Sequence, residues 1–248
     1  MRAPAIPIDA QLEAAELREY LGASYDHARL ERYEDQLESE LEEVGDEGRL
    51  YRTSDAYLYN LTAFAMTATK LPYLRDLTKI VEPGGRLLDY GCGIGSDGLM
   101  LLEMGYRVEF ADFDNPSTRY LRWRLERRGL EANVHDLDAG APPTGFDLAF
   151  AFDVIEHVPD PIAFLGALEE SASVVLVNLL EPEEGETGLH HELPIRAILG
   201  RARDRGLVRY RRYHRRSHLV AYGTEPAAGI ESLRSRIALW AGSRRRGA

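Results

Sequence analysis

Residues Leu87–Gly98 read LLDYGCGIGSDG, and this stretch decides the fold. An apolar run ends at Asp89, and three glycines follow at alternating positions, Gly91, Gly93 and Gly95. Glycine permits positive φ angles and lets the backbone approach a neighbouring group closely. A loop of this kind between a strand and a helix presents backbone amides and a helix N-terminus to a ligand. The motif alone does not separate a ligand-binding loop from a plain tight turn.

Short apolar runs alternate with helical segments on the C-terminal side of this stretch. The expected strands are Arg86–Tyr90, Arg107–Ala111, Asn133–His135, Asp147–Phe152, Val174–Leu179, Leu207–Tyr213 and His218–Tyr222, and the expected helices are Gly95–Met104, Pro116–Arg128, Pro161–Glu170 and Pro194–Arg205. This alternation predicts an α/β fold with a seven-stranded, mostly parallel sheet and helices on both faces. The connection around Arg215 and Arg216 is too short for a parallel crossover, so the last strand should be antiparallel.

The segment before the sheet is predicted to be helical. Apolar residues recur at helical spacing within residues 10–43, which favours one or two amphipathic helices before a turn at 45–48. A further helix should begin near Ser54 and end before Pro72, followed by a short helix over residues 73–81. We therefore expect an N-terminal helical extension (1–82), a core domain (83–223) and a C-terminal helix, Ile230–Trp240, with a basic tail (224–248).

Composition limits the class of protein. The chain has 248 residues, 44% of them hydrophobic, which is enough to bury a large core. Its single cysteine, Cys92, excludes an internal disulfide and a thiolate metal cluster. No signal peptide and no apolar run of membrane-spanning length is present, so we expect a cytoplasmic protein without a membrane partner. A net charge of −11 opposes general attraction to nucleic acid.

Charge is unevenly distributed along the chain. Residues 31–47 hold nine acids and one base, whereas residues 196–216 hold nine arginines and one acid. Solvated faces of helices and strands are the ordinary explanation of such runs. The alternative is that the arginines flank a substrate entrance and favour an anionic small molecule.

Carboxylates follow the next two expected strands. Asp112 comes twenty-one residues after Gly91, close to the spacing at which an acid at the end of the second strand meets ribose hydroxyls. Asp136 ends the third strand and could accept the exocyclic amine of an adenine ring. The two acids at consecutive strand ends favour a nucleoside-binding site.

These blocks, LLDYGCGIG, VEFADFD and NVHDLDAGAPPTGFDLAFAFDVIEHVPDP, resemble the class I S-adenosylmethionine-dependent methyltransferases over residues 86–223. The resemblance implies a Rossmann-like core with S-adenosyl-L-methionine as cofactor. By this resemblance Asp112 holds the ribose, and Asp136 with Leu137 frames the adenine. The remaining residues that it assigns to the cofactor are Asp89, Gly91, Cys92, Gly93, Gly95, Phe113 and Phe152.

A second cluster follows the fourth expected strand. Asp153, Glu156 and His157 lie at i, i+3 and i+4, and His190 and His191 follow the fifth strand. The pattern is similar to the metal-dependent O-methyltransferases, which implies that Asp153, Glu156, His157 and His191 bind a divalent metal. Magnesium or manganese is the first expectation, before iron or zinc. In the alternative, Glu156 and His157 only hydrogen-bond the loop, and His191 serves as a catalytic base or has no role.

The function expected from the resemblance is methyl transfer to a small molecule, first to a hydroxyl oxygen and alternatively to a nitrogen, with His191 and His157 as catalytic residues. The N-terminal extension is expected to form a lid over the substrate. Two alternatives stay open. One is a methyltransferase acting on RNA or a peptide, and the other is a non-catalytic subunit that binds the cofactor. The sequence leaves the acceptor and the oligomeric state open, a dimer included.

Overall fold

The computed structural model describes residues 9–181 and 190–223. The expected C-terminal helix, Ile230–Trp240, and the basic tail lie outside the described residues. The chain divides into two compact units, Met1–Pro142 and Pro143–Ala248. A membrane-crossing helix would have to be longer and more apolar than any helix found in the described ranges.

Seven strands form one sheet of order β3-β2-β1-β4-β5-β7-β6. Their bounds are β1 Arg86–Tyr90, β2 Arg107–Asp112, β3 Val134–Asp136, β4 Phe146–Ala151, β5 Ala172–Leu180, β6 Leu207–Tyr213 and β7 Ser217–Gly223. β1 pairs parallel to β2, β2 to β3, and β4 to β5, whereas β7 is antiparallel to both β5 and β6. The prediction of a mostly parallel sheet with an antiparallel last strand is confirmed, and so are the strand positions within one or two residues.

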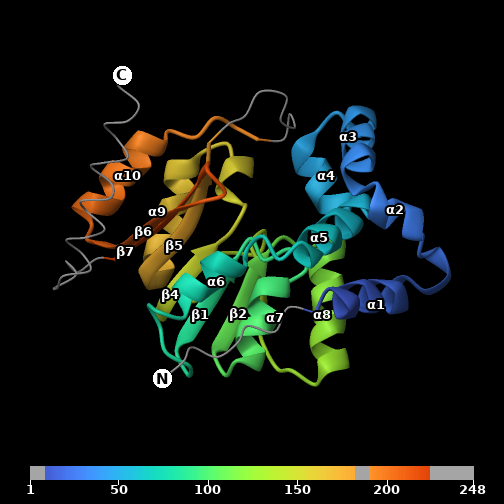
Figure 1. Cartoon of the computed structure of the whole chain (residues 1–248), viewed down its shortest axis with the longest axis horizontal. Helices are drawn as coiled ribbons and strands as arrows, with labels where there is room; N and C mark the ends of the chain where they lie inside the picture. Colours follow the sequence, from blue (N-terminus) through green and yellow to red (C-terminus); the bar gives the residue numbers. More distant parts are fainter. Residues whose placement is uncertain (1–8, 182–189, 224–248) are drawn as a thin grey trace. The chain divides into compact units, whose positions relative to one another are not determined.

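The first unit contains eight α-helices in its described part (Figure 1). They are α1 Ala10–Leu21, α2 His27–Glu31, α3 Tyr33–Val44, α4 Glu47–Thr53, α5 Ala56–Met66, α6 Leu71–Leu77, α7 Ser96–Glu103 and α8 Pro116–Arg128. The N-terminal helices share a buried apolar cluster with the glycine loop and α8, to which Leu17, Leu58, Tyr59, Ile94 and Tyr120 belong. They are therefore anchored on the glycine loop and α8.

Several local predictions differ from the structure. Three α-helices, α1 to α3, lie where one or two were expected, and α6 spans Leu71–Leu77 instead of residues 73–81. Residues 45–48 were expected to form only a turn, but Asp46 caps α4 by accepting a hydrogen bond from the Arg49 amide at 2.8 Å. The predicted cap Ser54 lies one residue before the N-cap of α5, Asp55. The Ser54 hydroxyl still accepts a hydrogen bond from the Tyr57 amide at 3.2 Å, so the serine binds the first turn from outside the helix.

The second unit carries two α-helices in its described part, α9 Pro161–Ser171 and α10 Ile195–Asp204, and a short 3-10 helix, η2 Ile155–His157. α9 packs against β4 and β5, and α10 packs against β6 and β7. Asp160 caps α9 by accepting hydrogen bonds from the amides of Ile162 and Ala163. The turn η2 follows β4 and carries the EH pair that the sequence singled out.

Candidate functional site

The glycine loop joins β1 to α7 with three positive φ angles, 75° at Gly91, 53° at Gly93 and 73° at Gly95. A Cβ atom at Gly95 would lie 2.4 Å from Leu121 Cδ1 of α8, and one at Gly93 would lie 2.8 Å from Leu61 Cδ1 of α5. A Cβ atom at either position would therefore require the opposing leucine side chain to move. The sequence pattern predicted the close approach but attributed it to a ligand alone, because a glycine motif does not reveal what lies opposite it.

Asp112, at the end of β2, fixes this loop through its carboxylate. Its Oδ2 accepts a hydrogen bond from the Gly93 amide at 2.7 Å, and its Oδ1 accepts one from the Phe113 amide at 2.7 Å. Burial raises the pKa of Asp112, and the two amide hydrogen bonds oppose that rise. The loop and the predicted ribose-binding acid are thus one hydrogen-bonded assembly.

Asp136 occupies the matching place on the neighbouring strand. It pairs with Asp112 in the parallel register of β2 and β3, and the Leu137 amide donates to the Asp112 carbonyl at 3.0 Å. The Asp136 Oδ1 atom accepts hydrogen bonds from the amides of Asp114, at 3.2 Å, and Asp138, at 3.0 Å. No hydrogen bond within the described residues uses its Oδ2 atom, which leaves an acceptor for a donor such as an amine.

Two further predicted residues, Asp89 and Cys92, have raised pKa values. Asp89 is buried and accepts a hydrogen bond from the Gly98 amide at 3.2 Å. Burial, and secondarily the charge of Asp97, raises the pKa of Asp89 well above its usual value. Burial also raises the pKa of the Cys92 thiol, with Asp112 adding to the rise. A protonated thiol is a poor nucleophile, so the raised pKa opposes a nucleophilic role for Cys92.

Arg52 is a residue of this region that the sequence did not single out. Its guanidinium carbon lies 3.9 Å from the centre of the Phe113 ring, and its Nη2 atom lies 2.8 Å from Asp138 Oδ1. The Asn115 side chain also donates to the Tyr51 carbonyl at 3.1 Å. Helix α4 is therefore attached to the residues that follow β2 and β3. Because α4 itself was not expected, no sequence signal pointed to Arg52.

The second unit brings together a different set of potential metal ligands from the set that the sequence predicted. Glu156, His157 and His190 each offer a ligand atom, and these atoms lie within 4.8 Å of one another. The rings of His157 and His190 are edge to face, with centroids 4.7 Å apart. The group includes neither Asp153 nor His191. A carboxylate and two imidazoles at these distances suit a transition metal ion.

Asp153 and His191 lie outside that group and make other contacts. Asp153 has a φ angle of 55°, its amide donates to Asn178 Oδ1 at 2.7 Å, and its Oδ1 accepts from Asn178 Nδ2 at 2.6 Å. His191 is exposed, and its backbone amide donates to the Glu156 carbonyl at 2.7 Å. Phe152, predicted to contact the cofactor, is buried and packs against Phe150 with ring centroids 5.1 Å apart.

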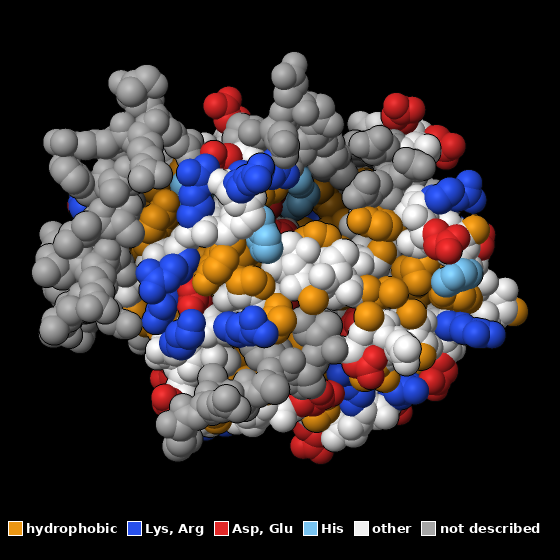
Figure 2. All heavy atoms as spheres, in the orientation of Figure 1, with side chains coloured by type: hydrophobic (Ala, Val, Ile, Leu, Met, Phe, Trp, Pro, Cys, Tyr) orange, Lys and Arg blue, Asp and Glu red, His pale blue; other side chains and the backbone are white. Residues whose placement is uncertain are grey.

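Many side chains of the arginine-rich stretch are engaged by carboxylates of the same unit. Arg201 and Arg205 contact Glu169, Arg203 contacts Asp204, and Arg212 contacts Glu181. Figure 2 shows further basic side chains on the surface, and the exposed ones of this stretch include Arg211 and Arg215. Ion pairing within the protein therefore engages part of the run.

A family model described as a methyltransferase domain matches residues 64–196, which is more than half of the chain. The chain belongs to this family. The predicted membership of the class I S-adenosylmethionine-dependent methyltransferases is confirmed at this level, and the methyltransferase fold agrees with the order of strands in the sheet. The match spans residues 153–157 and His191, but membership of the family does not show that these residues bind a metal.

Curated relatives match a shorter part of the chain. A ubiquinone biosynthesis O-methyltransferase from Xanthomonas campestris pv. campestris (strain B100) is 29% identical over 108 residues, covering 42% of this chain and 44% of that protein. One from Dinoroseobacter shibae is 35% identical over 103 residues, covering 40% and 41%. The chain thus matches less than half the length of these relatives.

Solved structures resemble the fold at low sequence identity. Magnesium protoporphyrin IX methyltransferase from Synechocystis PCC 6803, solved with bound SAH, has a TM-score of 0.51 and 16% identity, covering 64% of this chain and 86% of that one. TehB from Haemophilus influenzae has a TM-score of 0.51 and 16% identity, covering 62% of each chain. These likenesses confirm the fold class.

Proposed function

We propose that this protein transfers the methyl group of S-adenosyl-L-methionine to a small molecule, at a hydroxyl oxygen. The observation that carries the proposal is the assembly of Asp112, the glycine loop and Asp136 at the ends of adjacent parallel strands. Family membership and the names of the curated O-methyltransferase relatives support it. An anionic small molecule as substrate and a cytoplasmic location are further predictions from the sequence.

The donor groups of the first unit fit this cofactor. A carboxylate has about four acceptor sites, so Asp112 can hold the loop amides and still accept hydrogen bonds from ribose hydroxyls. Asp136 Oδ2 offers an acceptor to the adenine amine, with Leu137 beside it. The cofactor would supply a methyl group activated by a sulfonium charge, and the protein would align that group with the acceptor and exclude water.

Binding of the cofactor and of its demethylated product tests this function. We expect titration calorimetry of the whole protein to show saturable, one-to-one binding of S-adenosylmethionine and S-adenosylhomocysteine, with micromolar affinity. Adenosine triphosphate, which shares the nucleoside but lacks the amino-acid portion, serves as the control and should bind far more weakly. Absence of heat with both sulfur compounds would refute the proposal.

The group of Glu156, His157 and His190 is the metal site that we propose for the second unit. Compared with the sequence prediction, the group contains His190 in place of His191 and lacks Asp153. One carboxylate and two imidazoles favour zinc, manganese or iron over magnesium. A divalent ion there would increase the acidity of a substrate hydroxyl. His191, exposed beside the group, stays the proposed base, whereas His157 is assigned to the metal.

Metal-binding measurements distinguish the proposed roles of His190 and His191. We expect metal-free protein to bind one zinc or manganese ion, and His190→Ala to weaken this binding by more than the roughly 10- to 100-fold that loss of an outer-shell partner costs. His191→Ala is the matched control, because it removes the adjacent imidazole, and it should keep the affinity of the wild type. Equal weakening by both variants, or no stoichiometric binding by the wild type, would contradict the assignment.

A further inference from the structure

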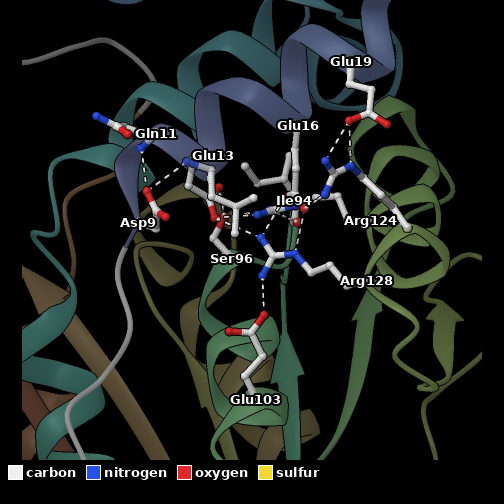
Figure 3. A network of polar contacts seen from close by, with 12 residues as sticks. Asp9, Gln11, Glu13, Glu16, Glu19, Ile94, Ser96, Glu103, Arg124 and Arg128 are labelled. Carbon is white, nitrogen blue, oxygen red and sulfur yellow. Dashed lines mark hydrogen bonds and ion pairs between the residues drawn. The ribbon is translucent and has the colours of Figure 1, made fainter.

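Helix α1 is joined to the glycine loop through one fully buried arginine, Arg124 of α8 (Figure 3). Its Nη1 atom donates to the Ile94 carbonyl and to the Ser96 hydroxyl, both at 2.9 Å. Its Nε atom donates to Glu16 at 2.8 Å, and its Nη2 atom donates to Glu13. A guanidinium has five N–H groups in a fixed plane, and four of them are used here. One side chain therefore contacts both the loop and α1.

The acids of α1 complete this network from the other side. Glu13 accepts a hydrogen bond from the Ser96 hydroxyl at 2.8 Å, so it contacts both Arg124 and the first residue of α7. Glu16, which has no exposed side-chain surface, also accepts hydrogen bonds from Arg128 at 2.7 and 2.8 Å. Burial alone would raise the pKa of Glu16, but the hydrogen bonds and charges of Arg128 and Arg124 outweigh it and lower that pKa. Glu16 is thus held as a carboxylate.

The network has an outer part that does not contact the loop. Arg127 donates to Glu19 of α1 at 2.8 Å, and the Glu19 side chain is 54% exposed. This ion pair joins the same two helices, yet Ile94 and Ser96 are not among its partners in the described residues. Arg127 also donates to Glu16, at 3.4 Å, so it is Glu19, which contacts Arg127 and not Arg124, that provides the internal comparison.

We propose that Arg124 is a positioning residue of the cofactor site. Arg124 holds the Ile94–Ser96 turn in place only while Glu13 and Glu16 of the docked helix α1 neutralise its charge. This inference rests on the proposed function. A buried charge that loses its partners is strongly destabilised, so undocking of α1 would draw Arg124 away from the Ile94 carbonyl. Because Gly95 lies within this turn and Gly93 directly precedes it, the loop would lose its shape. Linkage is reciprocal, so bound cofactor stabilises docking of α1 to the same extent.

The test compares Glu16→Gln with Glu19→Gln in the whole protein. For Glu16→Gln we expect S-adenosylhomocysteine to bind about tenfold more weakly, within the 5- to 150-fold range of typical couplings. The KM for S-adenosylmethionine should rise by a similar factor, while kcat at saturating cofactor changes by less than about twofold. Amide hydrogen exchange across residues 91–99 should be faster in the ligand-free variant. Glu19→Gln should match the wild type in all four measurements.

A second variant tests whether the effect of Glu16→Gln comes from loss of folding. Glu13→Gln removes the charge that contacts both Arg124 and Ser96, and it should show the same pattern in circular-dichroism-verified folded protein. Unchanged loop exchange and unchanged KM in both Glu13→Gln and Glu16→Gln would overturn the inference, as would a loss confined to kcat. If the wild type binds no sulfur cofactor but loop exchange still responds to Glu16→Gln and not to Glu19→Gln, the proposed function fails and the coupling of α1 to the loop stands.

Discussion

Asp112→Ala is expected to weaken S-adenosylhomocysteine binding by about 100-fold or more. Hydrogen bonds to a charged group contribute about 1.5–3 kcal/mol each. A ribose offers two hydroxyl donors, so the loss amounts to about 3–6 kcal/mol, and each 1.4 kcal/mol is tenfold in affinity. The substitution also removes the acceptor of the Gly93 amide, so loop and ligand lose the same partner. Titration calorimetry measures the effect.

Asp114→Ala is the matched control for this prediction. Asp114 is an exposed carboxylate two residues further on, and it pairs with Arg122 at 2.9 Å on the surface of the protein. Removal of an exposed ion pair costs about 0–1 kcal/mol, so binding should stay within a few-fold of the wild type. Comparable losses in the two variants would mean that general acidity at this edge, and not the position of Asp112, determines affinity. Thermal unfolding of both proteins without ligand verifies that each is folded.

The sheet was predictable because apolar periodicity acts locally. Buried parallel strands are short continuous apolar runs, and the Arg86–Tyr90 run and the Pro116–Arg128 helix end where the sequence places them. The relation of Asp112 to Asp136 was predictable for a similar reason. Parallel strands bring their carboxyl ends to one edge, so residues that end consecutive strands become neighbours.

The remaining parts of the site depend on contacts between distant residues. Arg124 meets Glu16 across 108 positions, and no spacing rule singles out one arginine among the five of α8. The histidines at 190 and 191 are adjacent, so only the course of the backbone decides which imidazole joins Glu156. Leu61 and Leu121 oppose the glycines from separate helices, and a glycine motif carries no information about them. Tertiary packing determines each of these features.

Gly95→Ala is expected to destabilise the protein by about 2–5 kcal/mol. A left-handed backbone costs a residue with a Cβ about 1–2 kcal/mol, and overpacking of a close-packed interior costs about 1–3 kcal/mol. Both conditions hold at Gly95, where φ is 73° and the added methyl would lie 2.4 Å from Leu121 Cδ1 and 3.2 Å from its Cγ. Leu121 is fully buried, so it has little room to move aside. Urea unfolding measures the loss as a shift of the midpoint at constant slope.

Gly129→Ala separates the cost of the left-handed backbone from the cost of the close contact with Leu121. Gly129, at the C-terminal end of α8, has a similar φ of 64°, but no atom lies within 4 Å of its Cβ position. It should therefore lose only the backbone part, about 1–2 kcal/mol, and the difference between the two variants isolates the contact with Leu121. In a Leu121→Ala background Gly95→Ala should cost less than it does alone, because residues in contact couple non-additively. Equal costs in both backgrounds would show that the loop moves as a body away from α8, and Leu121 would then not be the reason for glycine at this position.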